Sequence, residues 1–274
     1  MRPSSEALQA QIESFVSAWP EAEIAVALID PETGTRFSIQ GDRVFHAAST
    51  MKVPVLIEVY RQAAEDRFSL DDSLRVENDF TSIVDGSPFR IVDDSDDALY
   101  EHLGRSLPIR DLAERMITVS SNLATNLIIE LVQADSVQRT MEGMGTRTMR
   151  VLRGVEDIKA FEQGLNNTAT ASDLAVLLDA IRRNEAVSPA ASEAMRDILL
   201  DQEFNEMIPA GLPGTARVAH KTGWITGIVH DAAIVYPEHA PSYVLVILTE
   251  GFDDHAVASQ VGAGIARIVH EAVR

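Results

Sequence analysis

Two of the three lysines in this chain lie inside short motifs that can carry out chemistry. The 274 residues include 23 basic side chains, and the lysines among them are Lys52, Lys159 and Lys221. Lysine, unlike arginine, can lose its proton at an accessible pH when its surroundings lower its pKa. Lys52 follows Ser49 by three residues, and Lys221 begins a Lys-Thr-Gly tripeptide. A lysine three residues after a serine, in a chain that otherwise uses arginine, indicates proton transfer, with a chance arrangement as the alternative.

Ser49 and Lys52 have the spacing of a serine nucleophile and its base. They lie at i and i+3 at the start of a helix expected over 50–64, so both side chains share one face. Free N–H groups and the helix dipole at this end favour developing negative charge on Ser49. A serine hydroxyl is a poor nucleophile until a base takes its proton, and a neutral Lys52 can be that base. A capping serine beside an unrelated lysine is the alternative that this motif alone leaves open.

A second motif, Ser120-Ser121-Asn122, separates two expected helices. Ser120 can pass a proton, and the amide of Asn122 can donate to a substrate carbonyl. Asn126, one turn further on, can orient a neighbouring loop. The alternative is a capping serine followed by a turn asparagine.

The third motif, Lys221-Thr222-Gly223, lies in an expected strand. Lys221 and Thr222 suit an anionic carboxylate, and the glycine lets a substrate backbone come close. The backbone N–H of Trp224 can pair with that of Ser49 as an oxyanion hole. Alone, the tripeptide is equally consistent with an ordinary strand edge.

The apolar pattern predicts the elements that must position these motifs. Apolar runs joined by short turns predict five antiparallel strands, at 24–30, 35–39, 218–224, 228–236 and 243–249. Apolar residues at helical spacing predict helices at 6–19, 50–64, 108–119, 123–132, 171–182, 189–200 and 257–273. The acidic stretch 78–97, interrupted by glycine and proline, is interpreted as an irregular surface loop.

The order of these elements predicts the fold class. We expect an α/β (α+β) fold in which a five-stranded antiparallel sheet, flanked by helices, carries an inserted all-helical subdomain. The whole chain, 1–274, is predicted to form one domain. Residues 1–47 and 205–274 build its α/β half, and residues 48–204 build its helical half.

Composition restricts the partners and the chemistry. The net charge of −19 argues against nucleic acid and anionic membrane surfaces, because both attract basic patches. The absence of cysteine excludes disulfides, thiol catalysis and cysteine-based zinc sites. The sequence contains neither G-x-S-x-G nor H-E-x-x-H, which argues against an α/β-hydrolase and a zinc protease.

The three motifs together, in this order, are the signature of the penicillin-recognising serine enzymes. The chain resembles class A β-lactamases and the related D,D-peptidases over nearly its whole length, which implies a serine β-lactamase/transpeptidase-like fold. The resemblance implies a covalent acyl-enzyme on Ser49, with Lys52 as its base partner and Ser120 as a proton relay. The substrate contacts that it implies come from Asn122, Lys221, Thr222, Gly223 and Trp224.

A further match covers residues 162–166, which read E-x-x-L-N. In class A enzymes the glutamate of this motif activates the deacylating water and the asparagine helps to hold it. The resemblance therefore assigns these roles to Glu162 and Asn166, with a solvated loop glutamate as the alternative.

The chain also departs from the class A pattern. Ser121 stands where aspartate is usual, and Ala160 stands where an arginine is usual. The loop after Asn166 is several residues shorter, so the loop that aims Glu162 is rebuilt. His230 has no class A counterpart and is interpreted as a packed or cleft-edge histidine, not a catalytic one.

We expect β-lactam hydrolysis through the acyl-enzyme, by a monomer that acts on a small molecule without a cofactor or a metal ion. One alternative is a D,D-peptidase or esterase of the same superfamily with weak lactam turnover. The other is a non-catalytic penicillin-binding sensor module.

The first residues have no apolar segment typical of a signal peptide, and no apolar run approaches the roughly 20 residues of a membrane span. The resemblance implies a periplasmic or secreted protein. We therefore expect either a cytoplasmic location or a leader that has been removed.

Overall fold

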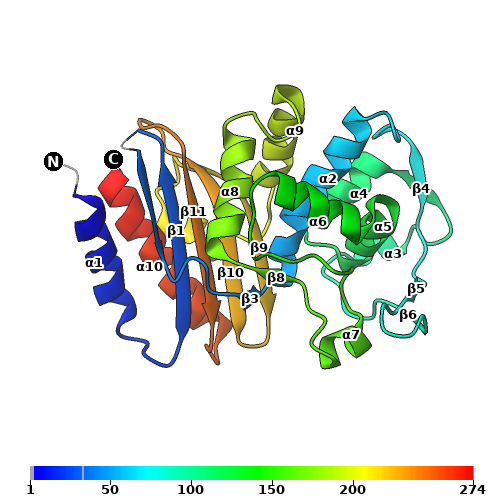
Figure 1. The fold of residues 1–274 in the computed structure, drawn as a ribbon, viewed down its shortest axis with the longest axis horizontal. Coiled ribbons are helices and arrows are strands. Elements are labelled where there is room, and N and C mark those ends of the chain that lie inside the picture. The colour runs from blue at the N-terminus through cyan, green and yellow to red at the C-terminus, as the bar shows by residue number, and fades with distance from the viewer. Residues whose placement is uncertain (1–2, 33, 274) are drawn as a thin grey trace.

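A five-stranded antiparallel sheet runs through one half of the molecule in the computed structural model, which describes residues 3–32 and 34–273 (Figure 1). The strand order is β2-β1-β11-β10-β9. The strands are β1 (Glu23–Asp30), β2 (Thr35–Ile39), β9 (Arg217–Ile225), β10 (Ile228–Tyr236) and β11 (Tyr243–Glu250). The predicted strands and fold class are confirmed. Residue 33, in the predicted turn between β1 and β2, lies outside the described residues.

Helices cover both faces of this sheet. α1 (Ser5–Val16) and α10 (His255–Val273) lie on one face, and α8 (Ala171–Arg182) packs on the other (Figure 1). Along β1, residues 24, 26 and 28 join the apolar core of α1 and α10, whereas residues 25, 27 and 29 join the core of α8. Because successive strand side chains point to opposite faces, a strand covered on both sides is apolar throughout.

The segment between the two groups of strands is mostly helical. Besides α8, its helices are α2 (Lys52–Ala64), α3 (Asp97–Tyr100), α4 (Ile109–Thr118), α5 (Asn122–Val132), α6 (Ala134–Gly143), α7 (Ile158–Glu162) and α9 (Pro189–Leu200). Two 3₁₀ turns, η1 (Ala48–Met51) and η2 (Pro209–Gly211), complete the helical elements. The predicted helices are present, and α3, α6 and α7 are additional.

Three short strand pairs tie the helical region together. The pairs are β3 (Phe45–His46) with β8 (Thr168–Ala169), β4 (Ser73–Arg75) with β7 (Ser106–Pro108), and β5 (Phe80–Thr81) with β6 (Pro88–Phe89). The stretch 78–97 is therefore not wholly irregular, since it contains the β5–β6 pair and reaches α3. Paired backbone groups at β5 and β6 give regular structure to a segment whose charge and glycine content alone predicted an irregular loop.

One apolar core connects the sheet to the helical region. Its buried residues come from β1, β10 and β11 and also from α2, α4, α5 and α8. The predicted division at residues 48 and 204 places α8 in the helical half, although α8 packs on the sheet. The two-half division therefore remains an interpretation of the chain order. Among the described residues, no helix has both the length and the apolarity required to cross a bilayer.

Candidate active site

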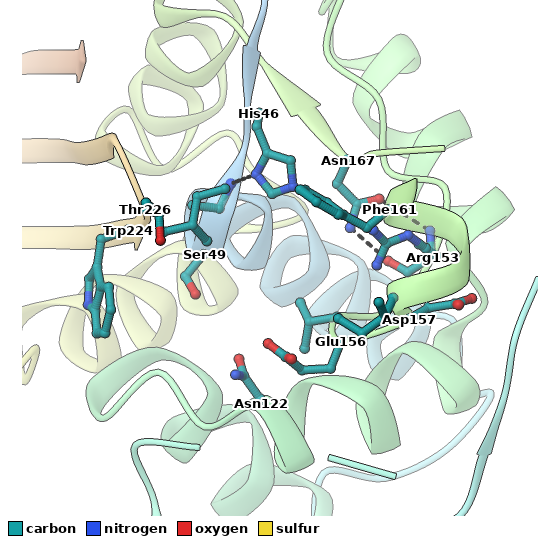
Figure 2. Close-up of a pocket in the computed structure, with 14 residues that line it drawn as sticks. His46, Ser49, Asn122, Arg153, Glu156, Asp157, Phe161, Asn167, Trp224 and Thr226 are labelled. Carbon is teal, nitrogen blue, oxygen red and sulfur yellow. Dashed lines mark hydrogen bonds between the residues drawn. The ribbon is translucent and has the colours of Figure 1, made fainter. Parts of the chain in front are cut away.

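A cavity of about 300 Å³ lies where the turn η1, the start of α5, the end of strand β9 and the segment 153–167 meet. Figure 2 shows the hydroxyl of Ser49, the amide of Asn122 and the carboxylate of Glu156 directed into this space, with Trp224 at its edge. The predicted nucleophile therefore faces a cavity of suitable size for a small molecule.

Ser49 lies inside the 3₁₀ turn η1, three residues before α2 proper begins. The preceding residue, Ala48, has a φ of 44°, a left-handed conformation that is strained for a residue with a Cβ. The backbone N–H of Ala48 donates to Nδ1 of His46 at 3.0 Å, which supports this conformation. The turn thus presents Ser49 to the cavity instead of burying it in the helix.

Gly223 brings β9 against the backbone of this turn. A Cβ placed on Gly223 would lie 2.7 Å from the backbone nitrogen of Ser49 and 2.9 Å from that of Thr50. Only glycine fits there, because real Cβ atoms do not approach backbone atoms so closely. The close approach predicted for Gly223 is therefore made by the chain's own backbone, where the sequence interpretation placed a substrate.

Lys52 is fully buried beside the second motif. Its Nζ donates to the carbonyl oxygen of Ser120 at 2.7 Å, to Ser120 Oγ at 3.2 Å and to Asn122 Oδ1 at 3.0 Å. Burial lowers the pKa of Lys52 to about 7, against the opposing attraction of Asp94 and Glu156. A large fraction of this amine is therefore neutral near pH 7, as a base requires.

Lys221 is also fully buried and reaches the same hydroxyl from β9. Its Nζ donates to Ser120 Oγ at 3.0 Å and to the carbonyl oxygen of Thr222 at 2.9 Å. Burial and then the charge of Lys52 lower the pKa of Lys221 well below its usual range, with Asp231 opposing them. Ser120, with a φ of 58°, thus holds its hydroxyl between two amines.

The structure does not bring Glu162 to this site. Glu162 is exposed at the end of α7 and is not among the residues that line the cavity. The side chain of Asn166 accepts a hydrogen bond from Nη2 of the buried Arg153 at 3.2 Å. The E-x-x-L-N segment therefore packs against its own loop, consistent with the rebuilt loop expected from the sequence.

Glu156 occupies the position facing Ser49 that was expected of Glu162. Glu156 is half-buried, lines the cavity and has a φ of 61°. Burial and then the neighbouring Asp93 raise the pKa of Glu156, while Lys52 and Arg153 oppose the shift. A carboxylate with a raised pKa in a cleft is a typical general base. Sequence reasoning missed Glu156 because it lies before the recognised motif.

Hydrogen bonds on both sides hold Glu156 in place. On one side, Asn126 of α5 accepts from the backbone nitrogen of Val155 at 2.6 Å and donates to its carbonyl at 3.0 Å. This is the loop-orienting contact expected of Asn126. On the other side, Asp157 accepts from Ser82 Oγ and from the backbone nitrogen of Ile83, both at 2.9 Å. These contacts hold the strained backbone of Glu156.

The remaining predicted residues surround β9. Thr222 is buried and borders a second cavity of about 290 Å³ on the other side of β9, whereas Trp224 borders both cavities. The indole of Trp224 is 57% exposed and meets the ring of His255 edge-on at 5.6 Å. His230 is fully buried, and burial lowers its pKa to about 4. Its Nε2 donates to the carbonyl oxygen of His46 at 2.9 Å, so the interpretation of His230 as a packed histidine is confirmed.

Comparisons with known proteins place this site in context. The model described as "Beta-lactamase enzyme family" matches residues 7–273. A point mutant of PBP-A, solved as an acyl-enzyme complex with penicillin G, has 28% sequence identity and a TM-score of 0.86, with 97% of this chain and 96% of that chain covered. A β-lactamase from Sphaerobacter thermophilus has 26% identity and a TM-score of 0.83, with 99% and 98% covered. β-Lactamase CTX-M-97 from Escherichia coli is 25% identical over 278 residues, covering 98% of this chain and 90% of that enzyme.

Proposed function

The chain belongs to the beta-lactamase enzyme family, and on that basis we propose that it is a serine hydrolase that opens β-lactams through an acyl-enzyme on Ser49. The observation that carries this proposal is the arrangement around Ser120, whose hydroxyl contacts the buried amines of Lys52 and Lys221 beside the cavity that Ser49 faces. Such an arrangement activates a serine and returns its proton to a leaving group.

Acylation begins when neutral Lys52 takes the proton of Ser49. Ser49 Oγ then bonds to the lactam carbonyl carbon, and the backbone N–H groups of Ser49 and Trp224 stabilise the oxyanion. The carbonyl carbon–nitrogen bond breaks, and the proton passes through Ser120 to the lactam nitrogen. The products of this step are the opened ring and an ester on Ser49.

Substrate binding uses the side chains beside these groups. Asn122, which lines the cavity, offers its amide to the acyl side chain of the substrate. Thr222 borders the second cavity, so its assignment to the substrate carboxylate places that carboxylate near Trp224, which borders both cavities. Lys221 is buried behind Thr222 and Ser120, where a lowered pKa favours the neutral amine. An incoming carboxylate opposes this shift, because a nearby negative charge favours the charged form of Lys221.

Deacylation is assigned to Glu156 in place of Glu162. Glu156 takes a proton from water, the water oxygen bonds to the ester carbonyl carbon, and the bond to Ser49 Oγ breaks as the proton returns to that oxygen. The half-buried Glu156 carboxylate lines the cavity with Ser49, whereas Glu162 lies outside it. The position of the carboxylate, more than the sequence motif around it, determines which glutamate can activate water.

Mass spectrometry with benzylpenicillin tests the proposal. We expect a short-lived adduct on the wild-type protein, no adduct on Ser49→Ala and a lasting adduct on Glu156→Gln. Glu162→Gln is the matched control, since it makes the same change on an exposed side chain and should turn over like the wild type. A lasting adduct on the wild-type protein would indicate a penicillin-binding peptidase or sensor. The absence of any adduct would show that β-lactams are not substrates.

We also propose that the enzyme acts as a monomer on small molecules. Every side chain in the scheme comes from a single chain, so the site needs no second copy for completeness. A periplasmic or secreted location, where β-lactams first arrive, belongs to the same proposal.

A further inference from the structure

The second motif, residues 120–122, has no acidic side chain of its own. A carboxylate from another part of the chain lies next to it. Ser121 is fully buried, and its Oγ accepts a hydrogen bond from the backbone nitrogen of Ala124 at 3.2 Å. Asp94, which precedes Ser121 by 27 residues, places its carboxylate beside it, and Ser121 Oγ donates to Asp94 Oδ2 at 3.4 Å. The carboxylate that is usual at position 121 is thus supplied from position 94.

Asp94 accepts hydrogen bonds from backbone N–H groups at the start of α5. Its Oδ1 accepts from the nitrogen of Asn122 at 2.7 Å, and its Oδ2 accepts from the nitrogen of Leu123 at 2.8 Å. With Ser121 accepting from Ala124, the first three N–H groups of α5 all have side-chain partners. Such groups otherwise lack intrahelical acceptors, and a carboxylate there interacts favourably with the helix dipole.

The segment that carries Asp94 is anchored on both sides. Asn78 exchanges two hydrogen bonds with the backbone of Ile91, at 2.8 and 2.9 Å. Asp96 is buried and accepts from Nη1 of Arg115 at 2.8 and 3.0 Å. Between these anchors, the hydroxyl of Tyr100 donates to Asp94 Oδ2 at 3.1 Å. The position of the carboxylate is therefore fixed by contacts other than those it makes to α5.

The same contacts extend to the catalytic groups. The backbone nitrogen of Asn122 donates to Asp94, and Oδ1 of Asn122 accepts a hydrogen bond from Lys52 Nζ at 3.0 Å. Lys52 also donates to Ser120, which directly precedes the capping residue of α5. A displacement of the α5 start would therefore move two partners of Lys52 at once.

We propose that Asp94 is a positioning residue for the reaction, supplying from a separate segment the carboxylate that Ser121 lacks and holding Ser120 and Asn122 against Lys52. The inference rests on the proposed function for its catalytic consequence. The charge of Asp94 also acts on Lys52, because it raises the pKa of Lys52 against the larger effect of burial. Removal of this charge should lower the pKa of Lys52 further.

Acylation by benzylpenicillin provides the first test. Asp94→Asn keeps the size of the side chain but removes its charge and one of its two acceptors, so we expect an acylation rate constant about 10- to 100-fold lower. The pH at which acylation reaches half its maximum should also move to lower pH. Asp97→Asn removes an exposed charge of the same segment and is the matched control.

Ser121→Asp separates a positioning role from general loss of structure. In the Asp94→Asn background it restores a carboxylate at the usual position of the motif, and we expect at least a tenfold recovery of acylation. In the wild-type background it places two carboxylates in contact, and we expect a slower reaction. A change that helps one background and harms the other is the sign of a shared role.

Lysine titration by NMR gives a readout that does not depend on lactam turnover. The chain has three lysines, so ¹³C labelling at the lysine Cε gives three signals to assign. We expect the Lys52 signal to titrate near pH 7 and to shift to lower pH in Asp94→Asn. Unchanged titration, or failure of Ser121→Asp to rescue, would overturn the role of Asp94. A wild-type protein that benzylpenicillin does not acylate would overturn the proposed function, while the titration would still decide on Asp94.

Discussion

In the proposed mechanism Lys52 acts as a base only while its amine is neutral, so the pH dependence of acylation should follow the pKa of Lys52. That pKa is lowered to about 7 by burial. Below pH 7 the protonated form dominates, and we expect the acylation rate constant to fall about tenfold per pH unit. Above pH 7 the rate should level off. Stopped-flow acylation with a chromogenic β-lactam between pH 5 and 9 measures this curve, and a flat profile would show that Lys52 is not the base.

Some residues of the site can be predicted from the sequence because their spacing is local. Ser49 and Lys52 lie three residues apart, and their shared face follows from helical geometry. Glu156 and Asp94 could not be found this way. Glu156 is placed at the cavity by the hydrogen bonds that its neighbour Val155 makes to Asn126 of α5. Asp94 reaches α5 across 28 residues, a contact that no local spacing encodes.

The approach of β9 to η1 places the third motif next to Ser49. We expect Gly223→Ala to destabilise the protein by about 1–3 kcal/mol, because its Cβ would lie 2.7 Å from the backbone nitrogen of Ser49. Acylation should slow at least tenfold as β9 and the turn move apart. Gly214→Ala is the control, since its Cβ would meet no atom within 4 Å. Urea unfolding and acylation kinetics measure both effects, and equal behaviour of the two variants would contradict this account.

Elements with a strong apolar pattern could be predicted, and those with weak patterns could not. The strands of the sheet are almost wholly apolar because helices cover both faces. α6 carries few buried side chains, among them Val137 and Met141, so its helical spacing is hard to recognise. α7 has five residues and is capped by Asp157, whose role depends on partners in another loop. Such elements form because tertiary contacts hold them.

Among the described residues, two lysine amines are buried next to a large apolar core. Lys52 and Lys221 are among the largest fully buried side chains. The transfer of an ammonium group into the interior costs free energy, and the lowered pKa of each lysine reflects that cost. The fold therefore gives up stability in order to keep both amines in contact with Ser120, as enzymes commonly do at their active sites.

This trade-off predicts that Lys52→Met is more stable than the wild-type protein and forms no acyl-enzyme. Below pH 7 the wild-type Lys52 is charged in both the folded and the unfolded state, and the folded state bears the cost of burying it. After the loss of the lysine hydrogen bonds is counted, we expect the variant to be more stable by about 2 kcal/mol.

The advantage should shrink as pH rises from about 7 towards 10.5, the ordinary pKa of lysine. In that range the folded wild type is already neutral at Lys52, while its unfolded state releases a proton, so wild-type stability rises with pH. Urea unfolding at pH 6 and pH 10 measures the difference. Lys159→Met is the control, because it removes an exposed lysine that pairs with Asp85 at 2.9 Å. A Lys52→Met variant that is less stable than the wild type at both pH values would show that the lysine's hydrogen bonds outweigh the cost of its burial.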